Sequence, residues 1–179
     1  PALANKADLL LGTVFLVIFV TAIVEGALAR YIAQYLNVIP MRVIIVGGGQ
    51  VGRALAKRLE ERGENVVIIE DDEETVEQLR NTGYATVIGD GTDTALLREA
   101  GAENAKIVVA ATGDDDVNLL VSQLAKSKFS AENVIARANN SENVEAFEEL
   151  DVNTISSAMA AAWAIDNEIE RPAIAHWMT

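Results

Sequence analysis

The 179-residue sequence has no cysteine, one histidine, three prolines and few aromatic residues. Without cysteine the chain has neither disulfides nor thiolate metal sites, which suits a reducing compartment. Bases are also scarce, because 14 Lys and Arg stand against 27 Asp and Glu, for a formal charge of −13. So acidic a surface repels phosphate backbones, and we expect no nucleic-acid partner.

The acidity is confined to one part of the chain. Residues 1–40 carry two acids and two bases, so the negative charge lies entirely in 41–179. With nine Arg among the bases, this acid excess resembles proteins of salt-loving archaea, in which counterions screen self-repulsion. A merely acidic cytosolic domain is the alternative. The sequence begins with Pro1 rather than Met, so we expect a piece of a longer protein.

One long apolar run stands near the start. Residues 9–28 read LLLGTVFLVIFVTAIVEGAL, with Glu25 as their only charge. As a helix this run would be about 30 Å long, the thickness of a bilayer core. We therefore expect 1–40 to hold a transmembrane helix, in contact with the lipid bilayer, and a linker. A long helix buried in an oligomer is the alternative.

Beyond Pro40, short β-branched runs alternate with amphipathic stretches. This alternation predicts a doubly wound, parallel α/β sheet of the Rossmann-like type, made of right-handed strand–helix–strand units. The expected strands are 42–46, 65–70, 85–88, 106–111, 134–138 and 154–156. Helices are expected at about 50–62, 73–81, 94–100, 115–128, 142–150 and 157–170.

A glycine motif, GGGQVG at 47–52, directly follows the first expected strand and opens a helix. In a dinucleotide-binding turn Gly47 permits the turn, Gly49 lets the backbone approach a pyrophosphate, and Gly52 lets helix and strand lie close. The helix that begins with Gln50 and Val51 supplies unpaired N–H groups, so the anion needs no basic side chain. A glycine turn that serves only the fold is the alternative.

The second expected strand ends in an acid. Glu70 lies 21 residues after Gly49, where a carboxylate can accept hydrogen bonds from both ribose hydroxyls. It would repel a 2′-phosphate, so NAD(H), AMP, ATP or another adenine nucleotide is preferred over NADP. Asp71 and Asp72 could substitute for Glu70, although Asp72 is also expected to cap the next helix.

From 41 to about 155 the chain resembles the nucleotide-binding N-terminal domain of the regulator of potassium conductance family, also called RCK, KTN or TrkA-N. The resemblance rests on GGGQVG at 47–52, IIED at 68–71, GDGTD at 89–93, REAGAENAKIVVAAT at 98–112 with DDDVN following, and VIARANN at 134–140. It implies an NAD-binding domain over 41–156.

The resemblance also implies individual contacts. Asp90, Gly91 and Thr92 would lie beside the adenine. Ala111 and Thr112 would lie over the cleft where a second phosphate or a nicotinamide extends, and Asn118 could face the same cleft. Arg137 could pair with phosphate or form a salt bridge with nearby acids. The acids 114–116 cap the next helix or, alternatively, bind a cation.

The groups of a hydride-transfer enzyme are missing from this sequence. Such enzymes need a proton-transferring His, or a Tyr with a Lys, near the nicotinamide. The sole histidine, His176, is three residues from the end, and no Tyr-x-x-x-Lys occurs. We therefore expect a regulatory domain and no enzyme, with no metal site. A redox enzyme fragment is the alternative.

The family couples ligand binding to membrane transport and assembles as dimers and larger rings. The resemblance thus implies a homodimer or ring, with 157–179 as a crossover or dimerisation helix, and 41–179 on the cytoplasmic side of the cell membrane. The stretch TAIVEGALARYIAQYLNV at 21–38 looks like the end of an NhaP- or Kef-type cation/proton antiporter. We therefore expect the domain to gate a monovalent cation (K⁺ or Na⁺) antiporter that precedes it in the same chain, or alternatively a potassium channel.

Overall fold

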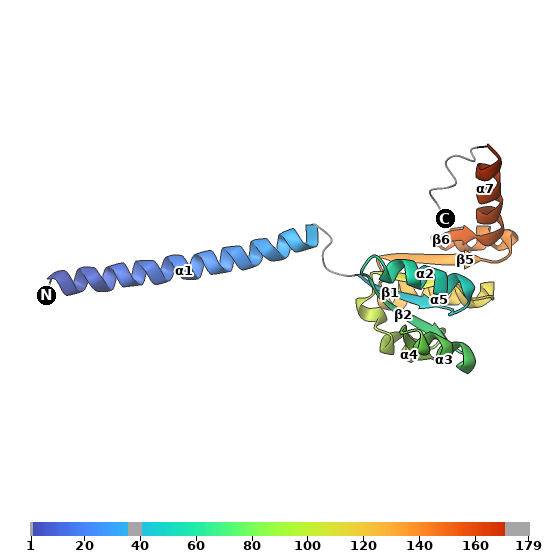
Figure 1. Cartoon of the computed structure of the whole chain (residues 1–179), viewed down its shortest axis with the longest axis horizontal. Helices are drawn as coiled ribbons and strands as arrows, with labels where there is room; N and C mark the ends of the chain where they lie inside the picture. Colours follow the sequence, from blue (N-terminus) through green and yellow to red (C-terminus); the bar gives the residue numbers. More distant parts are fainter. Residues whose placement is uncertain (1, 36–40, 171–179) are drawn as a thin grey trace. The chain divides into compact units, whose positions relative to one another are not determined.

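The computed structural model describes residues 2–35 and 41–170 and divides the chain into two compact units, Pro1–Pro40 and Met41–Thr179. The first unit holds one helix, α1 (Ala2–Tyr35). The second unit holds all of the described strands and the other helices (Figure 1). His176 and the end of the predicted linker at Pro40 lie outside the described residues.

The expected membrane-spanning segment at 9–28 is not supported. Among the residues that the structure describes, no helix combines the length and the apolar character needed to cross a membrane.

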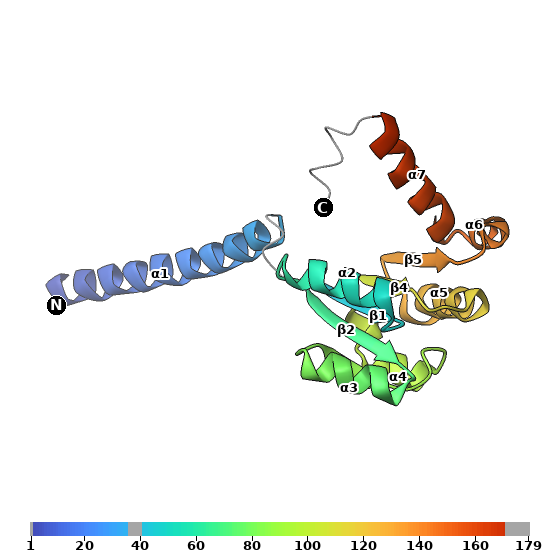
Figure 2. The ribbon, with the colours of Figure 1, turned by 45° about the vertical axis from the view of Figure 1, so that its right-hand side comes forward.

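The second unit is built on a six-stranded sheet in the order β3-β2-β1-β4-β5-β6. Each neighbouring pair is parallel, and the strand arrows of Figure 2 run in one common direction. The strands are β1 (Arg42–Val46), β2 (Asn65–Glu70), β3 (Ala85–Ile88), β4 (Ile107–Ala110), β5 (Asn133–Ala138) and β6 (Asn153–Ser156). The parallel, doubly wound sheet predicted from the alternating sequence is therefore confirmed.

Helices connect consecutive strands. They are α2 (Gln50–Glu60), α3 (Glu73–Asn81), α4 (Thr94–Glu99), α5 (Asp115–Phe129) and α6 (Val144–Glu149), with short 3-10 turns η1 (Ala102–Asn104) and η2 (Ser141–Asn143); α7 (Ser157–Glu170) follows the last strand. A parallel strand pair needs such a crossover, because a tight turn cannot return the chain to the start of the next strand.

The strands carry apolar side chains on both faces, so each face of the sheet has its own core. Val43 and Ile45 of β1 pack with Ala56 of α2 and Leu79 of α3. Their neighbours on the opposite face pack with Val121, Ala125 and Phe129 of α5, Leu97 of α4 and Phe147 of α6. Because successive side chains of a strand point to opposite faces, the apolar run RVIIV fills both cores.

The chain reverses its direction across the sheet at β1. From β1 it proceeds through β2 to β3, and α4 then returns it to β4 on the other side of β1. At such a switch point the loops after two neighbouring strands separate and leave a crevice at the carboxyl ends. Here those loops begin at Gly47, after β1, and at Ala111, after β4.

Candidate functional site: a pocket at the carboxyl ends of the strands

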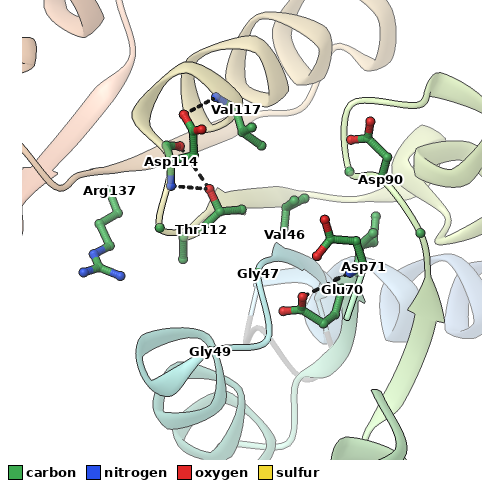
Figure 3. A pocket seen from close by; sticks show the side chains of 15 residues that line it. Val46, Gly47, Gly49, Glu70, Asp71, Asp90, Thr112, Asp114, Val117 and Arg137 are labelled. Carbon is green, nitrogen blue, oxygen red and sulfur yellow. Dashed lines mark hydrogen bonds between the residues drawn. The ribbon is translucent and has the colours of Figure 1, made fainter. Parts of the chain in front are cut away.

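A pocket of about 610 Å³ lies at this switch point (Figure 3). It is contributed by the loops after β1, β2, β3, β4 and β5, so residues far apart in the sequence meet in it. Its lining consists of Val46, Gly47, Gly49, Ile69, Glu70, Asp71, Gly89, Asp90, Gly91, Ala111, Thr112, Gly113, Asp114, Val117 and Arg137.

The glycines of the first turn have different reasons to be glycine. Gly47 has φ +105, and an added Cβ would lie 2.9 Å from the carbonyl carbon of Ala111. At Gly52 a Cβ would lie 1.9 Å from the carbonyl oxygen of Gly47, so the helix could not approach the turn. At Gly49 an added Cβ would meet nothing within 4 Å. The fold thus requires Gly47 and Gly52, whereas Gly49 leaves space in front of the backbone.

The start of α2 has backbone N–H groups to offer. Its N-cap residue is Gly49, and no side chain of the described chain caps this helix. In contrast, the side chains of Asp72, Asp93 and Asp114 accept backbone N–H groups at the starts of α3, α4 and α5. Uncapped N–H groups and the positive end of the helix dipole favour an anion beside Gly49.

Glu70 bridges the end of β2 and the glycine turn. Its Oε2 accepts from the N–H of Gly48 at 2.5 Å, and its Oε1 accepts from the N–H groups of Asp71 at 3.0 Å and Asp72 at 3.2 Å. A carboxylate oxygen can accept more than one hydrogen bond, so both oxygens retain capacity for a ligand hydroxyl. Glu70 therefore holds the turn in place and faces the pocket at once.

Asp90, in the loop after β3, is fixed by its neighbour Thr92. Its Oδ1 accepts from the Thr92 N–H at 2.8 Å and from the Thr92 hydroxyl at 2.7 Å. The backbone bond first, and the side-chain bond second, lower the pKa of Asp90 below its usual value. Asp90 is thus a charged acceptor on the same side of the pocket as Asp71 (Figure 3).

Asn118 joins the loops after β4 and β5. It is completely buried, and its Oδ1 accepts from the Thr112 N–H at 2.9 Å and the Thr112 hydroxyl at 2.7 Å. Its Nδ2 donates to the carbonyl oxygens of Thr112 at 3.2 Å and Arg137 at 2.9 Å. All of its side-chain hydrogen bonds therefore position the pocket wall, and its role toward a ligand runs through Thr112 and Arg137.

Among the described residues that line the pocket, Arg137 is the single base, opposite four acids. Its Nε donates to the hydroxyl of Ser157, the first residue of α7, at 2.7 Å. Within the described residues it makes no ion pair, since the salt bridges found there are Lys57–Glu61, Arg98–Glu103 and Lys126–Asp151. The alternative expectation was a salt bridge between Arg137 and a nearby acid, and no such salt bridge is found in that part of the chain.

Most residues that the sequence singled out meet in this pocket. Those that line it are Gly47, Gly49, Glu70, Asp71, Asp90, Gly91, Ala111, Thr112 and Arg137. The others do not line it. Asp72 caps α3, and Asn118 supports the loops after β4 and β5. Gln50 opens α2, Gly52 is buried by its approach to Gly47, Thr92 supports Asp90, and Val51 lines an apolar groove on the sheet face beside α2.

The remaining lining residues are not among the contacts predicted from the sequence. Gly89 has φ +139 and follows β3, a position where a positive-φ glycine could have been inferred from GDG. Val46, Ile69 and Val117 belong to apolar runs and carry no signal of a pocket. Gly113 and Asp114 follow β4, and Asp114 also caps α5, as expected. In the described part of the chain no group of His, Cys, Asp and Glu is arranged to hold a metal ion.

A family model, the TrkA-N domain, matches residues 43–158. A Trk system potassium uptake protein TrkA homolog of Methanothermobacter thermautotrophicus is 39% identical over 137 residues, 75% of this chain and 63% of that protein. The Trk system potassium uptake protein TrkA of Streptomyces coelicolor is 33% identical over 132 residues, 73% of this chain and 58% of that protein. The chain thus spans less than two thirds of the length of either relative.

Solved structures have the same fold. The NAD(P)-binding domain of an exopolyphosphatase-related protein from Archaeoglobus fulgidus matches with a TM-score of 0.66 at 26% identity, over 72% of this chain and 97% of that one. GsuK bound to ADP matches with 0.64 at 27% identity, over 74% and 34%. The Kef CTD of Shewanella denitrificans in its AMP-bound form, at 0.61 and 24% identity over 68% and 74%, shows the fold alone.

Proposed function

The chain belongs to the TrkA-N domain family, and on that premise we propose that it binds NAD(H) or an adenine nucleotide and thereby regulates a potassium transport protein. The observation that carries the proposal is the pocket itself. A glycine turn, an uncapped helix start and an acid at the end of β2 meet there at the switch point of a parallel sheet. These are the parts that hold the pyrophosphate and the ribose of a dinucleotide.

The arrangement of the lining residues favours one orientation of the ligand. The adenosine lies between Glu70 and Asp90, with its ribose hydroxyls on the Glu70 carboxylate. The first phosphate lies against the N–H groups at the start of α2, beside Gly49. The remainder of the ligand extends over Ala111 and Thr112 toward Arg137. NADP is disfavoured, because its 2′-phosphate would face the carboxylates of Glu70 and Asp71.

The relatives support a potassium transport protein as the partner. Two curated relatives are Trk system potassium uptake proteins, and a structural relative, GsuK, is a channel. We propose a monovalent cation/proton antiporter as the partner, from the likeness of 21–38 to the end of such carriers, with a potassium channel as the second candidate. Residues 41–179 then lie on the cytoplasmic side of the cell membrane, where nucleotides are available.

The protein acts as an assembly in this proposal. Residues 41–156 form the nucleotide-binding domain, and 157–179 contact a second copy in a homodimer or larger ring. The described part of α7 exposes Met159, Trp163, Ile165 and Ile169, the kind of apolar stripe that a subunit contact covers. A nucleotide would shift the equilibrium of the assembly between two gating states through its differential affinity for them.

A redox enzyme fragment is the competing function. Among the described residues, the lining of the pocket has no His, Tyr, Lys or Cys that could move a substrate proton, which favours a regulatory domain. Turnover of NADH by the full chain with a carbonyl substrate would support the enzyme instead.

Calorimetric titration of the full chain at high salt with NADH, NAD, AMP, ATP and NADPH tests the proposal. We expect saturable binding of the adenine nucleotides and NAD(H), and weaker binding of NADPH by about tenfold, or about 1.4 kcal/mol. Heats indistinguishable from dilution for all five ligands would contradict a nucleotide site.

A further inference from the structure

Arg137 lies between the nucleotide pocket and the start of α7. It lines the nucleotide pocket, and its Nε donates to the hydroxyl of Ser157 at 2.7 Å. Ser157 is the first residue of α7, which follows β6 directly. A single side chain thus connects the far end of the pocket with the start of the helix that carries the exposed apolar stripe.

The backbone of Arg137 is held on both sides. Its carbonyl oxygen accepts from the buried Asn118, and in the sheet Arg137 is paired with Ile155, two residues before Ser157. The side chain therefore starts from a fixed point, and movement at this position is left to the guanidinium and to the Ser157 end of its hydrogen bond.

The guanidinium has donors to spare. Arginine has five N–H groups, and Nε uses one of them on Ser157. For the terminal nitrogens of Arg137 no hydrogen bond or ion pair is found among the described residues. The Arg137 guanidinium is half-buried in a pocket that is also lined by four acids, and it has no carboxylate partner there. Its free N–H groups can therefore bind an anion.

Arg137 lies away from the acids that would hold the adenosine. Figure 3 shows it on one side of Thr112, whereas Asp71 and Asp90 lie on the other. A ligand with one phosphate, anchored at the glycine turn, ends before the guanidinium. A ligand with a second phosphate continues along the pocket toward it.

Resting on the proposed function, we propose that Arg137 is the positioning residue that reports a second phosphate to α7. The phosphate draws the guanidinium into the pocket, because it carries the opposite charge and can accept two parallel hydrogen bonds, whereas the Ser157 hydroxyl is a neutral acceptor. The bond from Nε to the Ser157 hydroxyl is thereby weakened. The start of α7 is then released. ADP, ATP and NAD(H) alter the environment of α7, whereas AMP occupies the pocket and leaves α7 unchanged.

The helix carries its own reporter. Trp163 of α7 is 71% exposed, and the only other tryptophan of the sequence is Trp177. In a full-length Trp177→Phe background, tryptophan fluorescence reports on α7 while calorimetry reports nucleotide affinity on the same sample. We expect ADP to change the emission of Trp163 and AMP to bind without a change.

Substitutions separate coupling from binding. Ser157→Ala removes the acceptor at α7, so ADP is expected to bind within about twofold of the parent affinity while the difference between ADP and AMP emission disappears. Ser157→Thr retains the hydroxyl and restores the difference. Arg137→Ala lowers the affinity for ADP about tenfold, and lowers that for AMP less. Ser127→Ala, on the exposed side of α5, is the matched control and keeps the parent response.

The outcomes distinguish this inference from the proposed function. Failure of both ADP and AMP to bind the parent chain removes the nucleotide site and the coupling together. Binding of both with identical emission changes, or a Ser157→Ala variant that still distinguishes ADP from AMP, overturns the role of Arg137 and leaves the nucleotide site intact.

Discussion

At the residue scale, Glu70 both stabilises the glycine turn and faces the pocket. Its carboxylate accepts three backbone N–H groups of the glycine turn and of the loop after β2. The same oxygens face the pocket in which we propose the ribose. Removal of the side chain would therefore disturb the turn as well as the ligand, and a variant of the same shape that keeps one acceptor oxygen gives the cleaner test.

Glu70→Gln should narrow the preference for NADH over NADPH by about tenfold, or about 1.4 kcal/mol. The amide oxygen can still accept from Gly48, whereas the charge that repels a 2′-phosphate is gone. Titration of both dinucleotides against parent and variant measures the ratio. Glu73→Gln, which removes an equal charge in the first turn of α3 outside the pocket lining, is the control. An unchanged ratio in Glu70→Gln would remove Glu70 from the ribose.

The glycines of the turn should respond differently to substitution. Gly52→Ala places a methyl group 1.9 Å from a backbone oxygen, so we expect a loss of about 3 kcal/mol or more in the free energy of unfolding. The Cβ of a valine at position 49 meets no protein atom within 4 Å, so Gly49→Val should lower the free energy of unfolding by only about 1 kcal/mol. Its side chain instead occupies the space in front of the helix start. Denaturant unfolding and nucleotide titration of each variant measure the two effects.

Gly49→Val should therefore fold and bind nucleotide at least tenfold, or about 1.4 kcal/mol, more weakly than the parent. Parent-like affinity in this variant would mean that the phosphate does not lie at the start of α2.

Asp115 connects α5 with the loop after β5 and gives the stability a pH dependence. Burial raises its pKa, but hydrogen bonds from the backbone of Asn139 and Asn140 and from the side chains of Asn143 and Asn139 together lower it below 3.8. A lowered pKa in the folded state stabilises the protein above the unfolded value of 3.8, and this contribution is lost as pH falls through the folded value.

Asp115→Asn removes this titration. We expect the variant to be less stable than the parent near neutral pH, and its free energy of unfolding to fall less steeply from about pH 5 to about pH 3. Urea unfolding across that range gives both curves. Parallel curves for parent and variant would show that Asp115 contributes no pH dependence.

The sequence predicts the place of a single residue at the site where a local pattern specifies it. The spacing of the glycines and the position of Glu70 after the second strand pointed to the pocket, because both are set within one strand–turn–helix unit. The partners of Asn118 and Arg137 were not predictable. Asn118 reaches a carbonyl 19 residues away and Arg137 reaches a hydroxyl 20 residues away, and only the completed sheet brings these groups together.

At the scale of elements, periodicity predicted the strands closely. The first three strands have the expected bounds, whereas β4 is shorter, at Ile107–Ala110 instead of 106–111. Its flanking residues still bond to β1, through the N–H of Lys106 to Arg42 and that of Ala111 to Val46. The helix expected at 142–150 is divided into η2 and α6, because the Asn140 side chain accepts from Glu142 and starts a 3-10 turn first.

The apolar run of α1 shows where composition alone misleads. Its length and hydropathy predicted a membrane span, which the described residues do not support. Hydropathy measures the preference of side chains for an apolar environment, and a bilayer is one of several such environments.

The exposed stripe of α7 should mediate self-association. Trp163→Asp places a charge in the proposed contact and is expected to raise the dissociation constant of the assembly by at least tenfold, or about 1.4 kcal/mol. Sedimentation equilibrium of parent and variant at matched salt measures it. Ala164→Asp, which adds the same charge at an exposed position on another face of this helix, is the control. Equal association of Trp163→Asp and parent would exclude this face as the contact.

At the scale of the whole molecule, an acidic body surrounds a pocket with one base. The net charge of −13 opposes the approach of any nucleotide, so the backbone N–H groups of α2 and the Arg137 guanidinium must supply the local attraction. Added salt screens the long-range repulsion more than these short contacts. Nucleotide affinity is therefore best measured at high salt, where this repulsion is weakest.

The central claim is that an adenine nucleotide lies in the pocket at the carboxyl ends of β1, β2 and β4. A crystal structure of the chain grown with ADP tests it most directly. We predict the first phosphate against the backbone N–H groups at the start of α2, with the ribose hydroxyls on the carboxylate of Glu70. An empty pocket at saturating ADP, or a nucleotide bound elsewhere on the molecule, would contradict it.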